Sequence, residues 1–335
     1  MTALLPAIVP VSLIILIGVL AGRKLSLDPQ TLSQLGVYIL APALVADSLY
    51  RTTLSVQSSF GLLLGFTIIS LLLYAIAWII SHFFHLSPAL QKSLMATTLF
   101  PNNGNLGLPL IDFALGSAGL ERAIVYMIGS SILMFGVAPA LLQGYSLDYG
   151  IRLTLKLPLI WAMLAGLSLR WLEIKLPLKL DEGITQLGEA AIPIALLLLG
   201  MQLASTSFHI GKYELVATVI RLVLAPLIAY GVGIALRLQG LDLQVLILQS
   251  AMPVAVNTVV LATEFGGDAS RVARTIVIST LLGFLTLPAI LWASARFGAK
   301  MIQLNGEYFF LKPDSFTSVE ITRIEMNCHR LLKRF

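Results

Sequence analysis

The sequence has little charge. Of its 335 residues only 12% are charged, whereas soluble globular chains carry roughly 25%. Hydrophobic residues make up 57%, and the mean hydropathy is +0.90. A chain this apolar cannot cover itself with polar groups in water, so we expect it to lie in a lipid bilayer. The net charge of +5 is modest, and the basic residues fall mainly between apolar runs and in the tail. This pattern is typical of membrane flanks and not of a nucleic-acid-binding surface.

Cysteine and histidine are scarce. The single cysteine, Cys328, excludes an intramolecular disulfide framework. No paired acids, His-rich motif or nucleophile with its base gather in one place, so we expect neither an enzyme active site nor a cofactor. We also predict no metal site, because all four histidines fall in expected loops or in the tail, at His82, His85, His209 and His329.

A secretory signal is not evident. A signal peptide has a basic stretch before a short apolar core, but no Lys or Arg precedes Arg23. The apolar run 3–22 is long enough to cross a bilayer, which takes about 20 helical residues. We therefore expect it to be the first membrane span.

Apolar runs of similar length recur along the chain. They are too long and too uniformly apolar for the alternating strands of a membrane β-barrel, so helices are expected. The predicted fold is an all-α, multi-pass protein of a cell (inner or plasma) membrane. Its ten candidate spans are 3–22, 31–50, 59–80, 88–115, 120–143, 157–171, 184–204, 213–236, 243–265 and 272–295.

These spans divide into two halves of five. We predict a first half at 1–143, a short central loop at 144–156, a second half at 157–296 and a polar, charged tail at 297–335. The end of the tail, 321–335, has the composition of a basic amphipathic surface helix or of a disordered segment. Loop charges slightly favour an outside N-terminus, whereas the basic tail favours the opposite, so both orientations stay open.

The two halves repeat each other's helix breakers. A shift of about 150 residues aligns Pro10 and Gly18 with Pro158 and Gly166, Pro42 with Pro193, Pro101 with Pro253, Asn105 with Asn257, Asp112 with Glu264, and Phe113 with Phe265. Since each half has an odd number of spans, the second half must enter the membrane inverted. Inverted repeats are common in secondary transporters. Chance alignment of prolines is the alternative.

Two spans are interrupted at corresponding places. The fourth reads Phe-Pro-Asn-Asn-Gly-Asn over 100–105, and the ninth reads Ala-Met-Pro-Val-Ala-Val-Asn-Thr over 251–258. Proline removes an amide donor and clashes with the preceding turn. Broken backbone at this depth survives only where it lines a protein-enclosed cavity, and matching breaks in two halves indicate a binding site.

The breaks suggest what is bound. Each exposes a half-helix N-terminus whose free N–H groups suit an anion such as a carboxylate. Asparagine adds neutral donors and acceptors without a buried charge. The alternative is that these side chains cap a kink or join helices. The predicted substrate-binding residues are Pro101, Asn102, Asn103, Asn105, Pro253, Asn257 and Thr258.

Ionisable residues within spans are functional candidates. Asp112 and Glu264 hold equivalent repeat positions and are candidates for coupling to H⁺ or Na⁺, or they lie at the interface without such a role. Arg221 is expected to pair with one of these acids or to contact an anionic substrate. Asp47 and Glu189 are expected near loops or in packing contacts.

The segment from Pro101-Asn102-Asn103 to Gly107-Leu108-Pro109 resembles the signature of the auxin efflux carrier family, which includes plant and bacterial members. The segments 251–266 and 190–200 are similar to its penultimate and seventh helices. The resemblance covers about 1–296. It implies ten helices in two inverted repeats, with helices four and nine crossing at their breaks. It also implies a homodimeric scaffold of helices one, two, six and seven beside a moving transport domain.

This sequence differs from the plant carriers in two ways. Its central loop is short, as in bacterial relatives, and Thr258 stands where the plant motif has a second proline. The resemblance therefore implies small organic anions, such as malate or malonate, as a class. The predicted function is elevator-type transport of such an anion. A cation/proton antiporter and a non-transporting ligand sensor are the alternatives; an antiporter would normally place acids at the breaks, where this sequence has asparagine.

Overall fold

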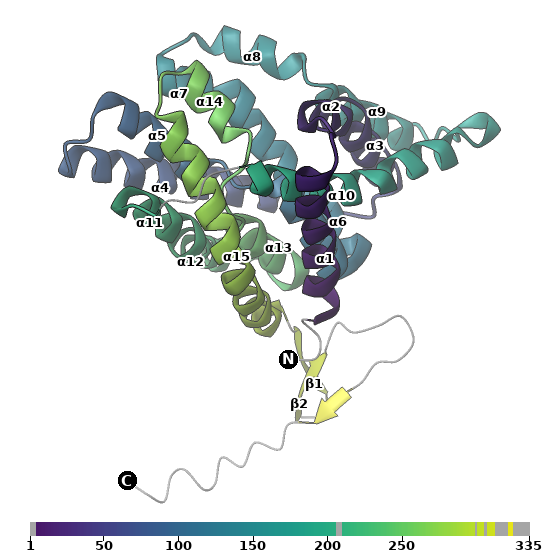
Figure 1. Ribbon diagram of the computed structural model, residues 1–335. Helices are drawn as coiled ribbons and strands as arrows, with labels where there is room; N and C mark the ends of the chain where they lie inside the picture. Colours follow the sequence, from purple (N-terminus) through teal and green to yellow (C-terminus); the bar gives the residue numbers. More distant parts are fainter. Residues whose placement is uncertain (1–4, 206–209, 299, 305–306, 312–320, 324–335) are drawn as a thin grey trace, which may run out of the picture.

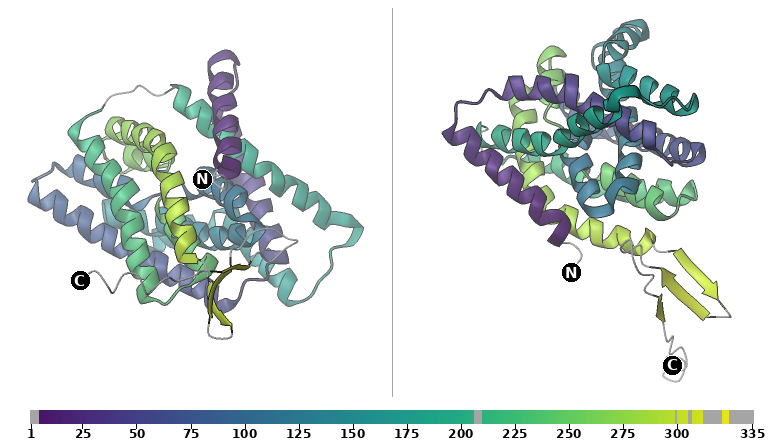
Figure 2. Two further views of the ribbon diagram at one scale, coloured as in Figure 1. Left: turned by 90° about the horizontal axis from the view of Figure 1, so that it is seen from below. Right: turned by 90° about the vertical axis from the view of Figure 1, so that its right-hand side faces the viewer.

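The computed structural model is a helical body with a small sheet at the C-terminal end (Figure 1, Figure 2). It describes residues 5–205, 210–298, 300–304, 307–311 and 321–323. Four short segments are π-helical (η1, η2, η3 and η5), and η4 is a 3₁₀ turn. The helical elements are α1 (Leu5–Lys24), α2 (Pro29–Leu35), η1 (Gly36–Leu40), α3 (Ala41–Arg51), α4 (Val56–Phe83), α5 (Pro88–Leu99), η2 (Asn103–Gly107), α6 (Leu108–Ser131), η3 (Ile132–Val137), α7 (Ala138–Gln143), α8 (Leu147–Leu155), α9 (Pro158–Trp171), η4 (Pro177–Lys179), α10 (Leu180–Ser205), α11 (Lys212–Val219), η5 (Ile220–Leu224), α12 (Ala225–Ala235), α13 (Gly240–Ser250), α14 (Thr258–Glu264) and α15 (Ala269–Gly298).

The helical, membrane-type character predicted from the sequence is confirmed for the body of the chain, whereas the three short strands at its C-terminal end were not predicted. Within the described residues, six helical segments are long and apolar enough to cross a membrane, or seven if the bent pair α8 and α9 forms one span. As far as the structure describes the chain, each of the ten predicted ranges falls on helix, but the fourth and ninth are divided into short helices by their breaks. The count of ten spans therefore stays a prediction.

The longest of these segments, Asn103–Gln143, is longer than one span. Its 41 residues would extend about 60 Å as a straight helix, twice the thickness of a bilayer core. Gly116 divides α6 with φ of 67° and ψ of −166°, a backbone conformation that favours glycine. The segment thus consists of two arms joined at an exposed bend, at the point where the sequence predicts one span to end and the next to begin.

Two helix pairs pack with their backbones in close approach. Gly18 of α1 lies against the backbone of Leu197 in α10, and Gly166 of α9 lies against the backbone of Ala46 in α3. At either glycine a Cβ atom would collide with a carbonyl group. Small residues at such contacts are the usual means by which helices associate in membranes.

The segment predicted as a central loop, 144–156, contains the helix α8. The hydroxyl oxygen of Ser146 accepts a hydrogen bond from the N–H of Tyr149, an N-cap that starts the helix. The predicted tail includes three antiparallel strands, β1 (Lys300–Leu304), β2 (Glu307–Leu311) and β3 (Ile321–Arg323), in the order β1-β2-β3. Of the possible helix at 321–335, residues 321–323 form β3 and the rest lie outside the described residues.

Candidate functional site

The two interrupted segments meet inside the helical body. The N–H of Asn102 donates to the carbonyl of Pro253 over 2.7 Å, and the N–H of Ala255 donates to the carbonyl of Phe100 over 2.9 Å. Pro101 and Val254 thereby form a short antiparallel bridge. The backbone of each break thus satisfies part of the other, which is how irregular backbone is tolerated at membrane depth.

Beyond this bridge each segment resumes as a helix and leaves donors free. Gly104 and Asn105 are the second and third residues of η2, and Val256 and Asn257 come directly before α14. In the part of the chain that the structure describes, none of the N–H groups of these four residues has a hydrogen-bond acceptor. The two pairs are related by the same shift of 152 residues that aligns Pro101 with Pro253. Both half-helix N-termini therefore present unpaired amides at equivalent positions.

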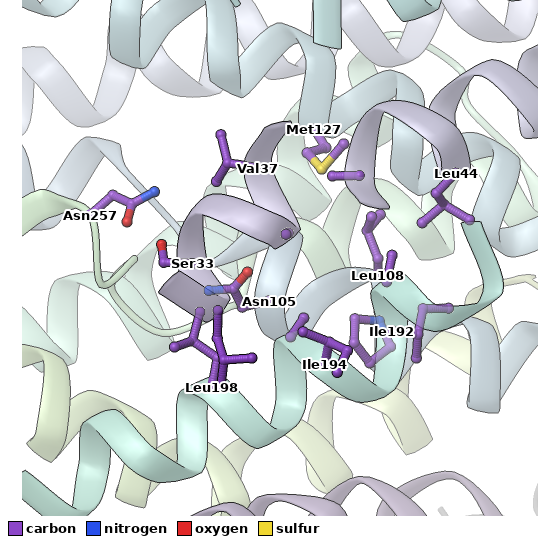
Figure 3. A pocket seen from close by; sticks show the side chains of 17 residues that line it. Ser33, Val37, Leu44, Asn105, Leu108, Met127, Ile192, Ile194, Leu198 and Asn257 are labelled. Atoms are coloured by element: carbon purple, nitrogen blue, oxygen red, sulfur yellow. The ribbon is translucent and has the colours of Figure 1, made fainter. Parts of the chain in front are cut away.

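These amides border a cavity. A hollow of about 140 Å³ is lined by the two breaks, by residues 127–135 of α6 and η3, by the start of α9, and by η1 and the start of α3. A second hollow of about 70 Å³ adjoins it and extends between η1, α6 and α10. Figure 3 shows the side chains of Asn105 and Asn257 on this second hollow, with Ser33 between them and Ile194 and Leu198 on the α10 wall. The two hollows share Val37, Ala41, Gly104, Asn105, Met127 and Asn257.

The cavity has polar groups at one end and apolar walls. Asn102 and Asn103 are 4% and 2% exposed, and in the described residues the Nδ2 atom of Asn102 and both side-chain polar atoms of Asn103 lack a partner. Leaving a buried polar group unpaired costs about 1–3 kcal/mol, so these atoms beside the cavity are candidates for ligand contact. The rest of the lining is largely apolar and includes Met134, Phe135 and Leu159.

Five of the seven predicted substrate-binding residues line the cavity, namely Pro101, Asn102, Asn103, Asn105 and Asn257. The other two do not. Pro253 contributes its carbonyl to the bridge. Thr258 is fully buried at the start of α14, and its hydroxyl has no partner in the described residues.

Arg221 has a role that the sequence did not predict. Its side chain is 1% exposed on η5 and meets neither an acid nor the cavity. Its Nη1 donates to the carbonyl of Thr98 over 2.7 Å, its Nε donates to the carbonyl of Met252 over 3.1 Å, and its Nη2 donates to the carbonyl of Ser250. Thr98 and Ser250 lie at the C-terminal ends of α5 and α13, and Met252 lies in the break just beyond α13. Arg221 therefore joins the two half-helices that end at the breaks.

The predicted coupling acids lie apart from the cavity. Asp112 is half-buried on α6 and Glu264 is exposed at the end of α14, and neither lines either hollow. Each acid follows its asparagine, Asn105 or Asn257, by seven residues, which is about two helical turns. This distance along the helix puts the acids away from the cavity. The buried acid is instead Glu214, which is 0% exposed and accepts from Nε of Arg274 over 3.1 Å, with Arg271 at 3.5 Å.

Sequence reasoning also missed the wall of the cavity opposite the breaks. Ser33 and Val37 precede the predicted proline of the second span, and Leu157 and Leu159 begin the sixth. Apolar or small residues at a span's start carry no chemical signal of their own. These lining residues are identified only by the structure, in which α10 and η1 pack against the segment around Pro101.

Comparison with known proteins decides the family. The model of the family described as "Membrane transport protein" matches residues 3–144 and 146–291. The chain belongs to this family. The resemblance to auxin efflux carriers is thereby confirmed, and the chain is a multi-pass membrane transporter.

The related proteins span most of this transporter. An uncharacterized transporter of Methanothermobacter thermautotrophicus is 32% identical over 79% of this chain and 88% of its own length. An uncharacterized transporter of Methanocaldococcus jannaschii is 25% identical over 84% of this chain and 97% of its own. A protein of Rhizobium meliloti named "Putative malonate transporter" is 26% identical over 83% of this chain and 92% of its own.

Proposed function

We propose that this chain is a secondary transporter of the cell membrane that carries a small organic anion, bound where the segments around Pro101 and Pro253 meet. One observation carries the proposal: four amide groups without acceptors, from two half-helix N-termini, border a single cavity. Helix N-termini bear partial positive charge and bind carboxylates and phosphates. The proposed ligand contacts are Asn102, Asn103, Asn105 and Asn257, with Pro101 in the wall.

The lining favours an anion over a cation. Neither hollow has an acidic residue among its lining residues, whereas a cation/proton antiporter would need carboxylates there. Asparagine can donate to a carboxylate through Nδ2 without bringing a buried positive charge. The hollow of about 140 Å³ is smaller than the roughly 300–1,000 Å³ typical of drug-sized ligands, which suits a small acid. The name of the Rhizobium meliloti relative makes malonate the first substrate to test.

Packing supports the proposed inverted repeat of ten helices. The shift that aligns Pro42 with Pro193 also aligns Ala46 with Leu197, and Gly18 aligns with Gly166. Gly18 of the first half contacts Leu197 of the second, and Gly166 of the second half contacts Ala46 of the first. The two contacts therefore join equivalent positions of the two halves. The bends between spans correspond too, because Gly116 and Gly266 have φ of 67° and 71°.

An elevator mechanism fits this arrangement. The two glycine contacts tie α1 to α10 and α3 to α9, the four elements that would form a static scaffold. The cavity lies where this group faces the broken segments. Movement of the broken segments along the scaffold would carry the bound anion across. The homodimer, and coupling to H⁺ or Na⁺ through Asp112 or Glu264, stay predictions from the sequence.

The experiment is malonate uptake by proteoliposomes together with malonate binding. Asn105→Ala and Asn257→Ala each remove a hydrogen-bonding side chain from the cavity. Loss of one hydrogen bond to a charged group costs about 1.5–3 kcal/mol, so affinity should fall about 10- to 150-fold. The matched control is Thr263→Ala, whose exposed hydroxyl lies on the outer side of α14 and bonds to its own helix.

Binding is read from the melting temperature of the purified protein. A ligand at 100 times its Kd stabilises the folded state by about 2.7 kcal/mol. Malonate should raise the melting temperature of the unaltered chain and of Thr263→Ala, and it should raise that of the asparagine variants much less. Equal transport by both asparagine variants and the control would refute the site. If malonate fails, the same assay with other mono- and dicarboxylates tests the anion class.

A further inference from the structure

The helix α8 lies at the outer end of the helical body, beside α7 and α9 (Figure 1). It connects the last helix of the first half to the first helix of the second half. Residues Asp148–Leu155 are bent by 66° from Pro158–Trp171. The sequence predicts α9 as the sixth membrane span, and a helix bent by 66° from a membrane-crossing helix runs much closer to the membrane plane.

One face of α8 is fixed to the protein. Gly150 is buried against the backbone of Gly136 in η3, where a Cβ atom would collide with the carbonyl group. One turn later the hydroxyl of Thr154 is buried near the same glycine. This contact sets which side of α8 faces outward.

The outward side is apolar and aromatic. Ile151 is 55% exposed, Leu155 49%, Tyr149 43% and the preceding Tyr145 49%. Trp161 at the start of α9 is 58% exposed, and its indole N–H donates to the carbonyl of Leu155 over 2.8 Å. Tyrosine and tryptophan with one polar tip are enriched at membrane–water interfaces, so this side of α8 matches the headgroup region.

Two cations share that side. Arg152 and Lys156 are four residues apart and one turn beyond Tyr149, which places them along one stripe of the helix. Both are exposed, and neither forms an ion pair within the described residues. Long basic side chains beside buried apolar residues extend toward the phosphate level of a bilayer.

We infer that α8 is a membrane-surface helix that binds the headgroups of anionic phospholipids through Arg152 and Lys156. Ile151 and Leu155 enter the apolar boundary of the bilayer, and the two tyrosines lie at the headgroup level. Lipid is the occupant favoured by the bend toward the membrane plane and by the pairing of unpartnered cations with exposed apolar side chains. This inference needs only that the chain lies in a membrane, so it stands apart from the proposed substrate.

The test uses the purified full chain in mixed micelles, with Trp161 as the reporter. Brominated acyl chains quench indole fluorescence on contact, and the contribution of Trp161 is found by subtracting the signal of Trp161→Phe. Brominated phosphatidylglycerol should quench at lower concentration than brominated phosphatidylcholine. Each basic residue near an anionic surface contributes about 1 kcal/mol, so the preference should fall about fivefold with Arg152→Gln and about 30-fold with Arg152→Gln/Lys156→Gln. It should also weaken as salt is added.

The matched control is Lys175→Gln/Arg237→Gln. It removes two exposed cations from the far ends of α9 and α12 and should leave the preference unchanged. The inference is overturned if the chain shows no preference for phosphatidylglycerol at low salt. It is equally overturned if the α8 double variant, folded with an unchanged melting temperature, keeps the full preference, as a surface for a protein partner would.

Discussion

Replacing Arg221 by Met should loosen the crossing of the two breaks. The guanidinium group donates to three carbonyls, two at the C-terminal ends of α5 and α13 and one in the break just beyond α13, and its side chain is almost fully buried. Methionine fills similar volume but donates nothing. Each buried acceptor left unpaired costs about 1–3 kcal/mol, so the free energy of unfolding should fall by about 3–9 kcal/mol. Even at the roughly 0.6 kcal/mol typical of interhelical hydrogen bonds in membranes, three bonds amount to about 2 kcal/mol.

The assay is thermal and denaturant unfolding of the purified protein, because total stabilities of about 5–15 kcal/mol make such a loss large. Arg221→Lys keeps a cation at the negative ends of two half-helices but loses the planar fork, so an intermediate stability is expected. Arg23→Met, which removes an exposed arginine at the end of α1, is the control. If Arg221→Met melts at the same temperature as Arg23→Met, the reasoning about the three carbonyls is wrong.

Three other contacts can be tested in the same way. Gly18→Val drives a side chain into the backbone of α10 and should lower the melting temperature, whereas Gly183→Ala, where a Cβ meets nothing within 4 Å, should not. Glu214→Gln takes the buried charge from its two arginine partners and should cost about 3–5 kcal/mol in denaturant unfolding; an unchanged midpoint would contradict this. Asn257→Asp puts a carboxylate beside the unpaired amides, so malonate uptake should fall without loss of stability, and undiminished uptake would argue against an anion site.

Much of the fold followed from where the sequence interrupts its apolar runs. The structure divides both predicted spans at Pro101 and Pro253, whereas two other aligned prolines, Pro10 and Pro193, lie inside the continuous helices α1 and α10. Gly116 ends one arm of α6 where a boundary was expected. The π-helical turns were not predicted, although each of the four comes directly before a helix with proline at its start, at Pro42, Pro109, Pro139 and Pro226, where the missing N–H and the ring interrupt the α-helical hydrogen bonds.

The helix α8 was missed for a different reason. Its nine residues are too few for a span, so the region was interpreted as a loop. Its own signals were present: Ser146 is a good N-cap residue, and Leu147, Ile151 and Leu155 recur every four residues. A search for short amphipathic helices between spans would have found it.

The polar part of the site was predictable because asparagine is rare in lipid-exposed helices. The roles of charged residues were not, because their partners are distant in the sequence. Arg221 lies 123 residues from Thr98 and 29 from Ser250. Glu214 lies 60 residues from Arg274. Carbonyl acceptors leave no trace in the sequence at all, so a buried arginine that binds three of them looks the same as one that binds a substrate.

The position of Arg221 also bears on which sign of charge the cavity favours. Breaking two helices creates four ends: two C-terminal ends with partial negative charge and two N-terminal ends with partial positive charge. Arg221 covers the negative ends, at α5 and α13. The positive ends, at η2 and α14, face the cavity, where no acidic residue lies among the lining residues. The protein therefore neutralises one half of the broken dipoles with its own side chain, and the other half is free to meet the proposed anion.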